Sequence, residues 1–371
     1  MSEVYLEDRF RGVMLGLAIG DAFGYPIELM DYDAICERFE KKGCLDLAVS
    51  KRTGTALFTD DTQLSLFTAD GLLWAHSAGA DEGQVNYEDY IFLAYQVWLY
   101  TQTKTVSGKE YAWLFDPAQN AYKLRLLKAK GLYKKRTADT KNIDALLKIR
   151  NMAYGTPERR LNDNKDNGAV KRSAPIGLYF YKDTKKAFDI GCRAAAITHG
   201  SPVGYISAGC YAAIIAEIVN GAEIEDAVKT VISMLDSIPD GDILKRTLVY
   251  AVELVDNEEL DPLSAVRKMG YGFEAYEALA IAVYCAILHC ESPRYAIQLA
   301  ANHDGASDTC ASMAGAMLGA YFGIQGFPKR WVEKLQYKNL ISAISDKLVK
   351  VVCEEEDEEE EAEGDEAGSA E

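Results

Sequence analysis

The sequence lacks the features that would place it in several common protein classes. No two of its eight cysteines form a C-x-x-C pair, so their spacing indicates neither a zinc site nor a disulfide framework. The most apolar run, Ala278 to Leu288, is too short to span a bilayer. The N-terminal residues are acidic and lack the apolar stretch of a signal peptide. We therefore expect a soluble, cytoplasmic protein that is not inserted in a membrane.

Strand-like alternation of apolar and polar residues is also almost absent. Helical spacing of apolar residues recurs along most of the chain instead. It predicts helices from residue 60 onward and over 5–18, 87–101, 187–198, 203–220, 224–235, 244–255, 275–290, 294–301, 308–322 and 330–352. The predicted fold class is all-α, a single compact multi-helix domain with its functional residues at helix starts and in loops.

The chain also lacks an overall excess of basic residues. Its formal net charge is −17, and residues 354–371 contribute −12 of this because they contain twelve acidic and no basic side chains. This composition predicts a disordered acidic tail after a domain that covers residues 1–353. The tail serves solubility or docks a basic partner protein, and the charge of the whole chain disfavours nucleic-acid binding.

Two adjacent carboxylates open one of the predicted helices. Asp60 and Asp61 follow Thr59, and the order of residues predicts Asp60 as the N-cap with Gln63 as its capping-box partner. The same stretch offers several oxygen ligands within one turn, and Mg²⁺ prefers oxygen ligands. Capping is the more common role of such residues, so this cluster alone does not predict a metal site.

A second acidic cluster lies far along the chain, before a predicted helix that is rich in alanine and glycine. Small side chains let the backbone of that helix approach its neighbours closely. Two clusters of Asp and Thr, each opening a buried helix, can face each other and share a metal. The second cluster reads His303-Asp304-Gly305-Ala306-Ser307-Asp308-Thr309.

Several other stretches are candidates for ligand contacts. Glu28 is a third carboxylate that could reach the acidic clusters, or a plain surface residue. Asn167-Gly168 tolerates positive φ and can turn N–H groups toward an anion, or it forms an ordinary turn. His199 ends a helix, which explains it without any function. Residues 104–165 hold fifteen Lys or Arg against six Asp or Glu, either as a solvated face or to attract an anionic substrate.

In this order, the motifs resemble the ADP-ribosylglycohydrolases, a family that includes the dinitrogenase-reductase-activating glycohydrolases and the ADP-ribosyl-acceptor hydrolases. The resemblance covers about residues 8 to 325, and the Thr-Asp-Asp and Ser-Asp-Thr elements are its most specific part. The motifs that carry it are Gly20-Asp21-Ala22-Phe23-Gly24 with Glu28, Thr59-Asp60-Asp61-Thr62, Asn167-Gly168-Ala169-Val170-Lys171-Arg172 before Ala174-Pro175-Ile176-Gly177, Thr198-His199, and Asn302 to Thr309.

The resemblance implies an all-α hydrolase that cleaves the N- or O-glycosidic bond between C1″ of ADP-ribose and a protein side chain, commonly arginine or serine. Up to two Mg²⁺ or Mn²⁺ ions would lie between the first and last motifs. By position, the metal ligands would be Thr59, Asp60, Asp61, Asp308 and Thr309. Glu28 and Asp61 would be catalytic. ADP-ribose, or the ADP-ribosylated protein, would be contacted by Asn167, Gly168, Ala169, His199, Gly305 and Ser307.

Two residues depart from the family pattern. The last motif of the family reads Asp-x-Asp-Thr, and Ala306 stands at its first position here. A methyl group cannot coordinate a cation, so we expect one of the two metal sites to be weakened. Asp304 is the nearest substitute, but it would need a different loop path. The second departure is Lys171, at a position that is usually apolar and often methionine.

Three explanations of Ala306 follow from the sequence. The chain is a natural hydrolase with one metal or weak activity, a natural ADP-ribose-binding protein without turnover, or a protein with an engineered inactivating change. We expect a Mg²⁺-dependent hydrolase that removes ADP-ribose from modified protein side chains and is impaired by Ala306 to some degree. The alternative is a catalytically silent ADP-ribose-binding protein on the same fold.

Overall fold

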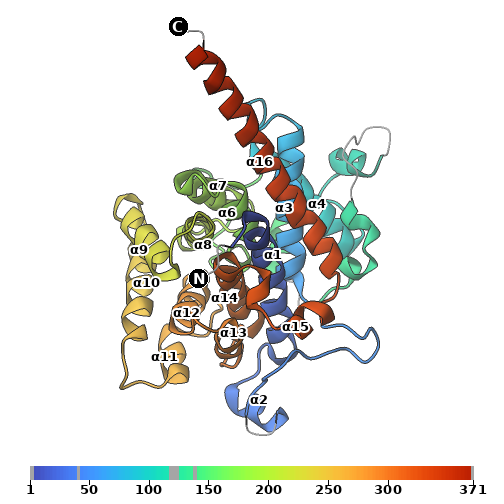
Figure 1. Cartoon of the computed structure of the whole chain (residues 1–371). Helices are drawn as coiled ribbons and strands as arrows, with labels where there is room; N and C mark the ends of the chain where they lie inside the picture. Colours follow the sequence, from blue (N-terminus) through green and yellow to red (C-terminus); the bar gives the residue numbers. More distant parts are fainter. Residues whose placement is uncertain (1–3, 40–41, 117–124, 137–139, 369–371) are drawn as a thin grey trace.

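Helices make up the regular structure of this chain. The computed structural model describes residues 4–39, 42–116, 125–136 and 140–368, with side chains up to residue 353. Across these residues the backbone forms α-helices and short 3-10 helices, and the pairing typical of strands is limited to three isolated bridges between loops. The predicted all-α fold class is confirmed (Figure 1).

The elements follow one another with short connections. The α-helices are α1 (Leu6–Gly24), α2 (Tyr32–Arg38), α3 (Asp60–Ser77), α4 (Tyr87–Thr103), α5 (Thr140–Lys148), α6 (Ala174–Tyr179), α7 (Thr184–Ala196), α8 (Pro202–Val219), α9 (Ile224–Met234), α10 (Asp242–Val255), α11 (Pro262–Met269), α12 (Ala275–Leu288), α13 (Pro293–Ala301), α14 (Ser307–Phe322), α15 (Lys329–Lys334) and α16 (Lys338–Gly368). The 3-10 helices are η1 (Tyr25–Ile27), η2 (Lys109–Phe115), η3 (Arg125–Lys128), η4 (Lys130–Tyr133), η5 (Val170–Arg172), η6 (Leu235–Ser237) and η7 (Ile324–Gly326).

The helices α1 and α14 form the central pair of the fold and lie side by side (Figure 1). Glycines spaced four residues apart on α1 face α14. A Cβ atom at Gly20 would lie 2.0 Å from the carbonyl oxygen of Ala311, and one at Gly24 would lie 2.3 Å from the backbone nitrogen of Asp308. Because only glycine permits this approach, the contact fixes the start of α14 against the end of α1.

The helix α8 lies in the core beside α6, α7, α12 and α14. By length and apolar composition alone it is long enough to cross a membrane, as are α1 and α2 if this strongly bent pair is taken as one span. However, 83% of α8 is buried inside the fold. In this structure α8 is therefore a core helix that packs against other helices.

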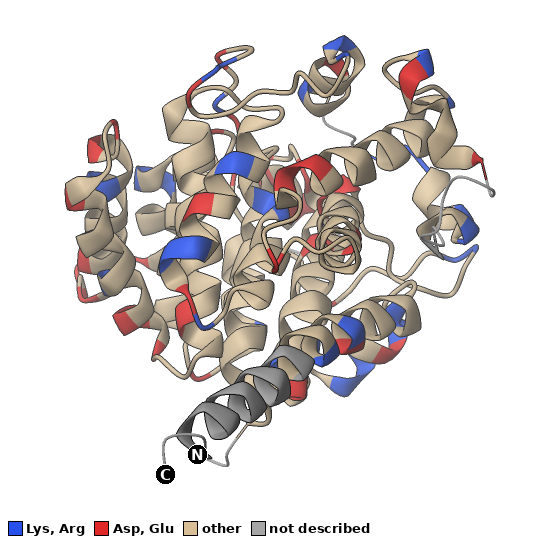
Figure 2. Cartoon of the chain, turned by 90° about the horizontal axis from the view of Figure 1, so that it is seen from above, with Lys and Arg blue, Asp and Glu red and all other residues tan. Residues whose placement is uncertain are grey.

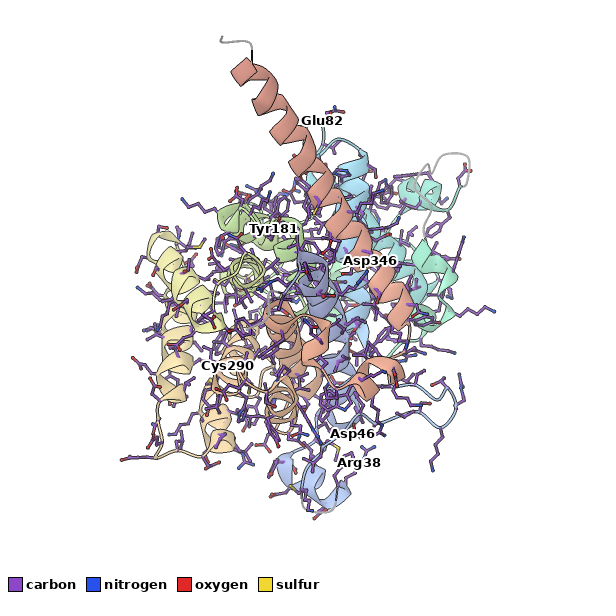
Figure 3. The ribbon with its side chains drawn as sticks, viewed as in Figure 1. Arg38, Asp46, Glu82, Tyr181, Cys290 and Asp346 are labelled. Carbon is purple, nitrogen blue, oxygen red and sulfur yellow. The ribbon has the colours of Figure 1, made fainter. Side chains whose placement is uncertain are left out.

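The sequence prediction of a single helix over residues 330–352 is wrong, because the chain breaks between α15 and α16. Leu335 pairs with Ala56 in an isolated bridge, and Tyr337 has a φ of +57°. The helix α16 then packs on α1, where Arg11 Nε donates to Asp346 Oδ1 at 2.6 Å; Asp346 is labelled on α16 in Figure 3. The side chains of residues 354–371 lie outside the described residues, so the disordered acidic tail stays a prediction.

The periodic pattern also fails to predict α2, α5, α6 and α11. Each of these helices has nine residues or fewer, which is too few turns to establish a periodic apolar face. In Figure 2 the inner helices are mostly free of charged residues, which lie mainly on outer helices and loops. Buried carboxylates are an exception to this distribution, and four of them gather where α1 ends and where α3 and α14 begin: Asp21, Asp60, Asp61 and Asp308.

Candidate active site

The first turns of α3 and α14 meet beside the C-terminal end of α1. The hydroxyl of Thr309 donates to Asp61 Oδ2 at 2.8 Å, across 248 residues of sequence. The backbone N–H of Thr309 donates to Asp308 Oδ1, also at 2.8 Å. All three residues are buried. The expectation that the two acidic clusters face each other is confirmed.

Asp21 of α1 joins this cluster, although the sequence reasoning assigned it no role. Its carboxylate accepts hydrogen bonds from the backbone N–H of Thr59 at 2.9 Å and from the backbone N–H and hydroxyl of Thr62 at 3.0 and 2.5 Å. Burial and the nearby charge of Asp61 raise the pKa of Asp21 to about 8. The signal that could have found it is its place inside the Gly-Asp-Ala-Phe-Gly motif.

The N-cap of α3 is Thr59, so the prediction that Asp60 and Gln63 form a capping box is wrong. Thr59 Oγ1 accepts the backbone N–H of Asp61 at 3.2 Å. The side chain of Gln63 turns away from the helix start and accepts the indole N–H of Trp98 at 3.1 Å. Since Asp21 and Thr59 already satisfy the N–H groups of the first turn, the carboxylates of Asp60 and Asp61 have other partners.

Those partners include Lys171, on the 3-10 turn η5. Its Nζ lies 2.5 Å from Asp61 Oδ1 and 3.2 Å from Asp60 Oδ2. The side chain of Lys171 is 6% exposed, and those of Asp60 and Asp61 are 2% and 0% exposed. The sequence reasoning noted Lys171 only as a departure from an apolar position and gave it no part in the site. That departure was the available signal.

Asp304 does not replace the carboxylate that Ala306 lacks. Asp304 Oδ1 accepts the backbone N–H of Tyr32 at 2.7 Å, and Oδ2 accepts Arg267 Nε at 2.6 Å. The hydrogen bond from Arg267 lowers the pKa of Asp304. Both carboxylate oxygens are therefore engaged by partners outside the acidic cluster, and the side chain at the start of α14 is the methyl group of Ala306.

The residues predicted to bind Mg²⁺ or Mn²⁺ do not fit such an ion in this arrangement. The ammonium of Lys171 lies against Asp60 and Asp61, and Ala306 offers no ligand. Among the side chains that the structure describes, no three of His, Cys, Asp or Glu come together in a way that could hold a metal ion. The predicted ions therefore stay a prediction, and no chemical step below depends on one.

Glu28 lies at the edge of the cluster, where the resemblance placed it. Burial and the charges of Asp61 and Glu28 raise the pKa of Asp308 well above its usual range, although Lys171 acts in the opposite direction. Glu28 follows η1, and the backbone N–H of the next residue donates to the carbonyl of Gly305 at 3.1 Å. Glu28 Oε2 is shielded from solvent. Glu28 and Asp308 thus form the side of the cluster next to the 305–307 loop.

The Asn167-Gly168 loop packs against residues 272 and 273. Asn167 donates its backbone N–H to the carbonyl of Phe273 at 2.9 Å and its amide Nδ2 to the carbonyl of Gly272 at 2.7 Å. Gly168 N donates to Asp166 Oδ1 at 3.1 Å. Neither Asn167 nor Gly168 has a positive φ. The predicted positive-φ turn is wrong, because contacts with Asp166 and the neighbouring segment hold the loop in another conformation.

His199 is fully buried behind this loop. Its Nε2 lies 2.8 Å from Asp166 Oδ1, and its Nδ1 lies 2.9 Å from the hydroxyl of Thr198. Lys141 Nζ lies 2.7 Å from Asp166 Oδ2. Burial would raise the pKa of Asp166, but His199 and Lys141 together lower it well below its usual range. The structure places His199 against Asp166, and its predicted contact with substrate stays a prediction.

Two exposed aromatic rings stand beside the start of α14. The rings of Tyr271 and Phe273 are stacked with centroids 6.3 Å apart, and the residues are 59% and 43% exposed. The carbonyl of Tyr271 accepts the backbone N–H of Ala306 at 2.9 Å. A Cβ at Gly305, which has a φ of +133°, would lie 2.1 Å from that carbonyl oxygen. The segment that carries the rings is therefore anchored both to the Asn167-Gly168 loop and to the start of α14.

Two more of the predicted ligand contacts are buried. Ala169 and Ser307 have no exposed surface, and Ser307 Oγ has no hydrogen-bond partner among the described residues. Ser307 opens α14 next to Gly24, whose added Cβ would meet its carbonyl carbon. The structure thus brings Ser307 into the cluster, while Ala169 packs beneath the loop.

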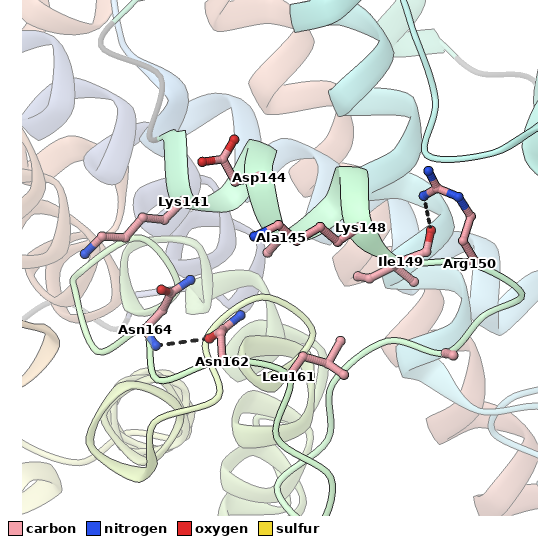
Figure 4. Close-up of a pocket in the computed structure, with 10 residues that line it drawn as sticks. Lys141, Asp144, Ala145, Lys148, Ile149, Arg150, Leu161, Asn162 and Asn164 are labelled. Atoms are coloured by element: carbon pink, nitrogen blue, oxygen red, sulfur yellow. Dashed lines mark hydrogen bonds between the residues drawn. The ribbon is translucent and has the colours of Figure 1, made fainter.

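A hollow of about 430 Å³ lies on the far side of the Asn167-Gly168 loop (Figure 4). Three basic residues of its rim are Lys141, Lys148 and Arg150, from α5 and the residues after it. Asn162 and Asn164, also in its wall, both donate their side-chain amides to the carbonyl of Thr198, at 3.0 and 3.1 Å. This hollow is therefore connected to His199 rather than to the acidic cluster.

A second hollow of about 530 Å³ lies next to the residue before Thr59. Arg136 is in its wall and donates from Nη1 to the carbonyl of Phe58 at 2.8 Å. The basic residues that line it are Arg52, Lys130, Lys134, Lys135 and Arg136. Part of the basic excess of residues 104–165 is thus collected beside the start of α3, which favours the interpretation that this segment attracts an anion.

Comparisons with known proteins agree with this arrangement. A family model described as ADP-ribosylglycohydrolase matches residues 2–358. The chain is 24% identical to the ADP-ribosylarginine hydrolase Tri1 of Serratia proteamaculans, covering 94% of this chain and 81% of that protein. It is 23% identical to the ADP-ribosylhydrolase ARH3 of Mus musculus, covering 88% and 87% of the two chains.

A solved structure gives the same answer for the fold. The chain described as an ADP-ribosylglycohydrolase-related protein complex superimposes with a TM-score of 0.57 at 20% identity, covering 94% of this chain and 99% of that one. The extent of the family match confirms the resemblance drawn from the motifs. The chain therefore belongs to the ADP-ribosylglycohydrolases, a family of glycosidic-bond hydrolases.

Proposed function

We propose that this chain binds ADP-ribose attached to a protein side chain and hydrolyses the bond at C1″. The observation that carries the proposal is the hydrogen bond between Thr309 and Asp61, which closes the two helix starts into one buried acidic cluster. Perturbed carboxylates gathered in one place are typical of acid and base catalysis. Family membership gives the reaction class, and the cluster gives the residues that would perform it.

Hydrolysis requires one proton to leave water and one to reach the leaving group. The hydroxyl of water bonds to C1″, the C1″–N or C1″–O bond breaks, and the leaving side-chain atom keeps the electron pair and takes a proton. We assign the proton transfers to Glu28 and Asp308, because the pKa of Asp308 is raised and the charge of Glu28 contributes to that shift. Asp61, the other predicted catalytic residue, orients the cluster through Thr309 and Lys171.

Two features outside the cluster support ADP-ribose as the ligand. The exposed rings of Tyr271 and Phe273 offer a stacking surface for a purine base, at the end of a segment that contacts the start of α14. The basic hollow at Arg136 offers positive charge for a pyrophosphate or for an acidic protein surface near the modified residue. Both features lie next to the helix starts that form the cluster.

A catalytically silent ADP-ribose-binding protein is the second candidate. The observation that favours it is the pair of departures from the family pattern, since Ala306 removes a carboxylate and Lys171 places an ammonium among those that remain. In that case the chain would bind ADP-ribose with no release from any modified side chain. Turnover of either an arginine-linked or a serine-linked substrate would eliminate this candidate.

The test is the release of ADP-ribose from arginine- and serine-linked peptides, followed by chromatography. We would examine the arginine-linked peptide first, because one relative is named an ADP-ribosylarginine hydrolase. Asp308→Asn should abolish release while the chain stays folded by circular dichroism. Asp226→Asn, at an exposed carboxylate on α9, is the matched control and should retain full activity. Equal activity of Asp308→Asn and the parent chain would refute the assignment of the site.

A further inference from the structure

We infer that Lys171 is an internal cation that takes the place of a divalent metal ion in this site, so that the chain binds ADP-ribose without a metal. The inference rests on the proposed function only for the identity of the ligand. Its core concerns the acidic cluster itself: the carboxylates Asp60 and Asp61 are neutralised by a side chain of the same protein.

The geometry of the ion pair excludes a shared metal at the same oxygens. The ammonium lies 2.5 Å from Asp61 Oδ1 and 3.2 Å from Asp60 Oδ2. These are distances of charge-assisted hydrogen bonds. A Mg²⁺ ion bound to the same oxygen atoms would need to lie roughly 2.0–2.1 Å from each of them. The ion and the ammonium would then occupy overlapping volumes and repel each other as like charges, so one cation excludes the other.

The charges of the two departures add up to those of one divalent ion. Relative to the pattern that the chain resembles, Ala306 removes one negative charge and Lys171 adds one positive charge. Together the two changes shift the charge of the cluster by two positive units, which is the charge that one Mg²⁺ would have contributed. The departures lie on different elements, Ala306 before α14 and Lys171 on η5, but both contribute to the same buried cluster.

Lys171 is held in place by its neighbours in the turn. Its carbonyl accepts the hydroxyl of Ser65 at 3.3 Å, and the same hydroxyl donates to the carbonyl of Asp61 at 2.8 Å. The next residue, Arg172, is fully buried and donates from Nη2 to the hydroxyl of Thr198 at 2.7 Å. Its guanidinium lies 4.2 Å from the ring centroid of Tyr95. The backbone of η5 is thus fixed on both sides, so the ammonium is a built part of the site.

The first measurement is binding of Mn²⁺ to the full chain after treatment with EDTA and buffer exchange, read as the loss of the free Mn²⁺ signal in electron paramagnetic resonance. The parent chain should leave the signal unchanged. The double variant Lys171→Met/Ala306→Asp restores the residue types of the pattern and should bind the ion. Lys185→Met, which removes an exposed lysine on α7, should behave like the parent. Stoichiometric Mn²⁺ binding by the parent would overturn the inference, whether or not the double variant folds.

The second measurement is calorimetry of ADP-ribose binding to the parent chain in EDTA and in Mg²⁺. Equal affinity in the two buffers supports the inference, and binding that occurs only with Mg²⁺ overturns it. Binding in neither buffer would contradict the proposed function instead, while the Mn²⁺ measurement would still decide whether Lys171 excludes a metal. The two failures are therefore distinguishable.

Discussion

Replacing Lys171 by methionine tests the buried ion pair through the stability of the protein. Methionine keeps an unbranched side chain of similar size and removes the ammonium from Asp60 and Asp61. Because all three side chains are at most 6% exposed, water screens the loss only weakly. Removing one partner of a buried ion pair costs about 3–5 kcal/mol, since it leaves an uncompensated buried charge. We therefore expect Lys171→Met to lower the free energy of unfolding at pH 8 by about 3–5 kcal/mol.

The loss should depend on pH and on metal. At pH 5 it should be smaller, because the two carboxylates of the folded variant can lose their charge by binding protons. Added Mn²⁺ should stabilise the variant but not the parent chain, since an ion that binds only the folded state raises stability by mass action. Both dependences follow from the same cause, which is the missing positive charge beside Asp60 and Asp61.

The assay is urea denaturation in EDTA, followed by circular dichroism, at pH 5 and pH 8. Lys185→Met is the control, and a surface substitution of this kind should change stability by no more than about 0.5 kcal/mol. A loss below about 1 kcal/mol for Lys171→Met is the range of exposed ion pairs. Such a loss, together with no effect of Mn²⁺, would refute the reasoning.

Three further substitutions test other parts of the structure. Gly24→Ala places a Cβ 2.3 Å from Asp308 N and should lower stability by about 1–3 kcal/mol in thermal melts; an unchanged melt would contradict the close helix contact. In the folded chain the pKa of Asp166 is lowered, so its contribution to stability is present above its unfolded value of about 4 and is lost as the pH falls. Asp166→Asn should therefore cost stability at pH 7 but much less at pH 3 in urea denaturation, and an equal cost at both would contradict the ion pair. Tyr271→Ala should weaken ADP-ribose binding by about 1–3 kcal/mol in calorimetry, as for loss of a stacking surface, whereas unchanged affinity would remove its ring from the binding site.

Much of the fold and part of the site follow from local features of the sequence. Apolar residues repeat with helical spacing over most of the chain, and this period predicts an all-α fold without any tertiary information. The pairs Asp60-Asp61 and Asp308-Thr309 stand at helix starts, where side chains are aimed by the first turn. The prediction that these helix starts face each other then needed only the Ala- and Gly-rich helix between them and its neighbours.

The contacts that decide the chemistry are not local, and the sequence did not predict them. Lys171 reaches Asp60 and Asp61 from a turn more than a hundred residues away, and nothing in the spacing of the three residues indicates the pair. Asp21 caps α3 from another helix, which is why the expected capping box at Asp60 does not form. The break at Tyr337 has the same origin, since the bridge of the nearby Leu335 belongs to tertiary structure.

The most direct test of the account is the release of ADP-ribose from arginine- and serine-linked peptides by the parent chain in EDTA. The same assay on Lys171→Met/Ala306→Asp with Mn²⁺ is the comparison. We predict release by the parent chain that EDTA does not diminish, because Lys171 supplies the positive charge of the cluster. No release by the parent from either peptide, alongside Mn²⁺-dependent release by the double variant, would contradict the account and leave the chain as a silent binder of ADP-ribose.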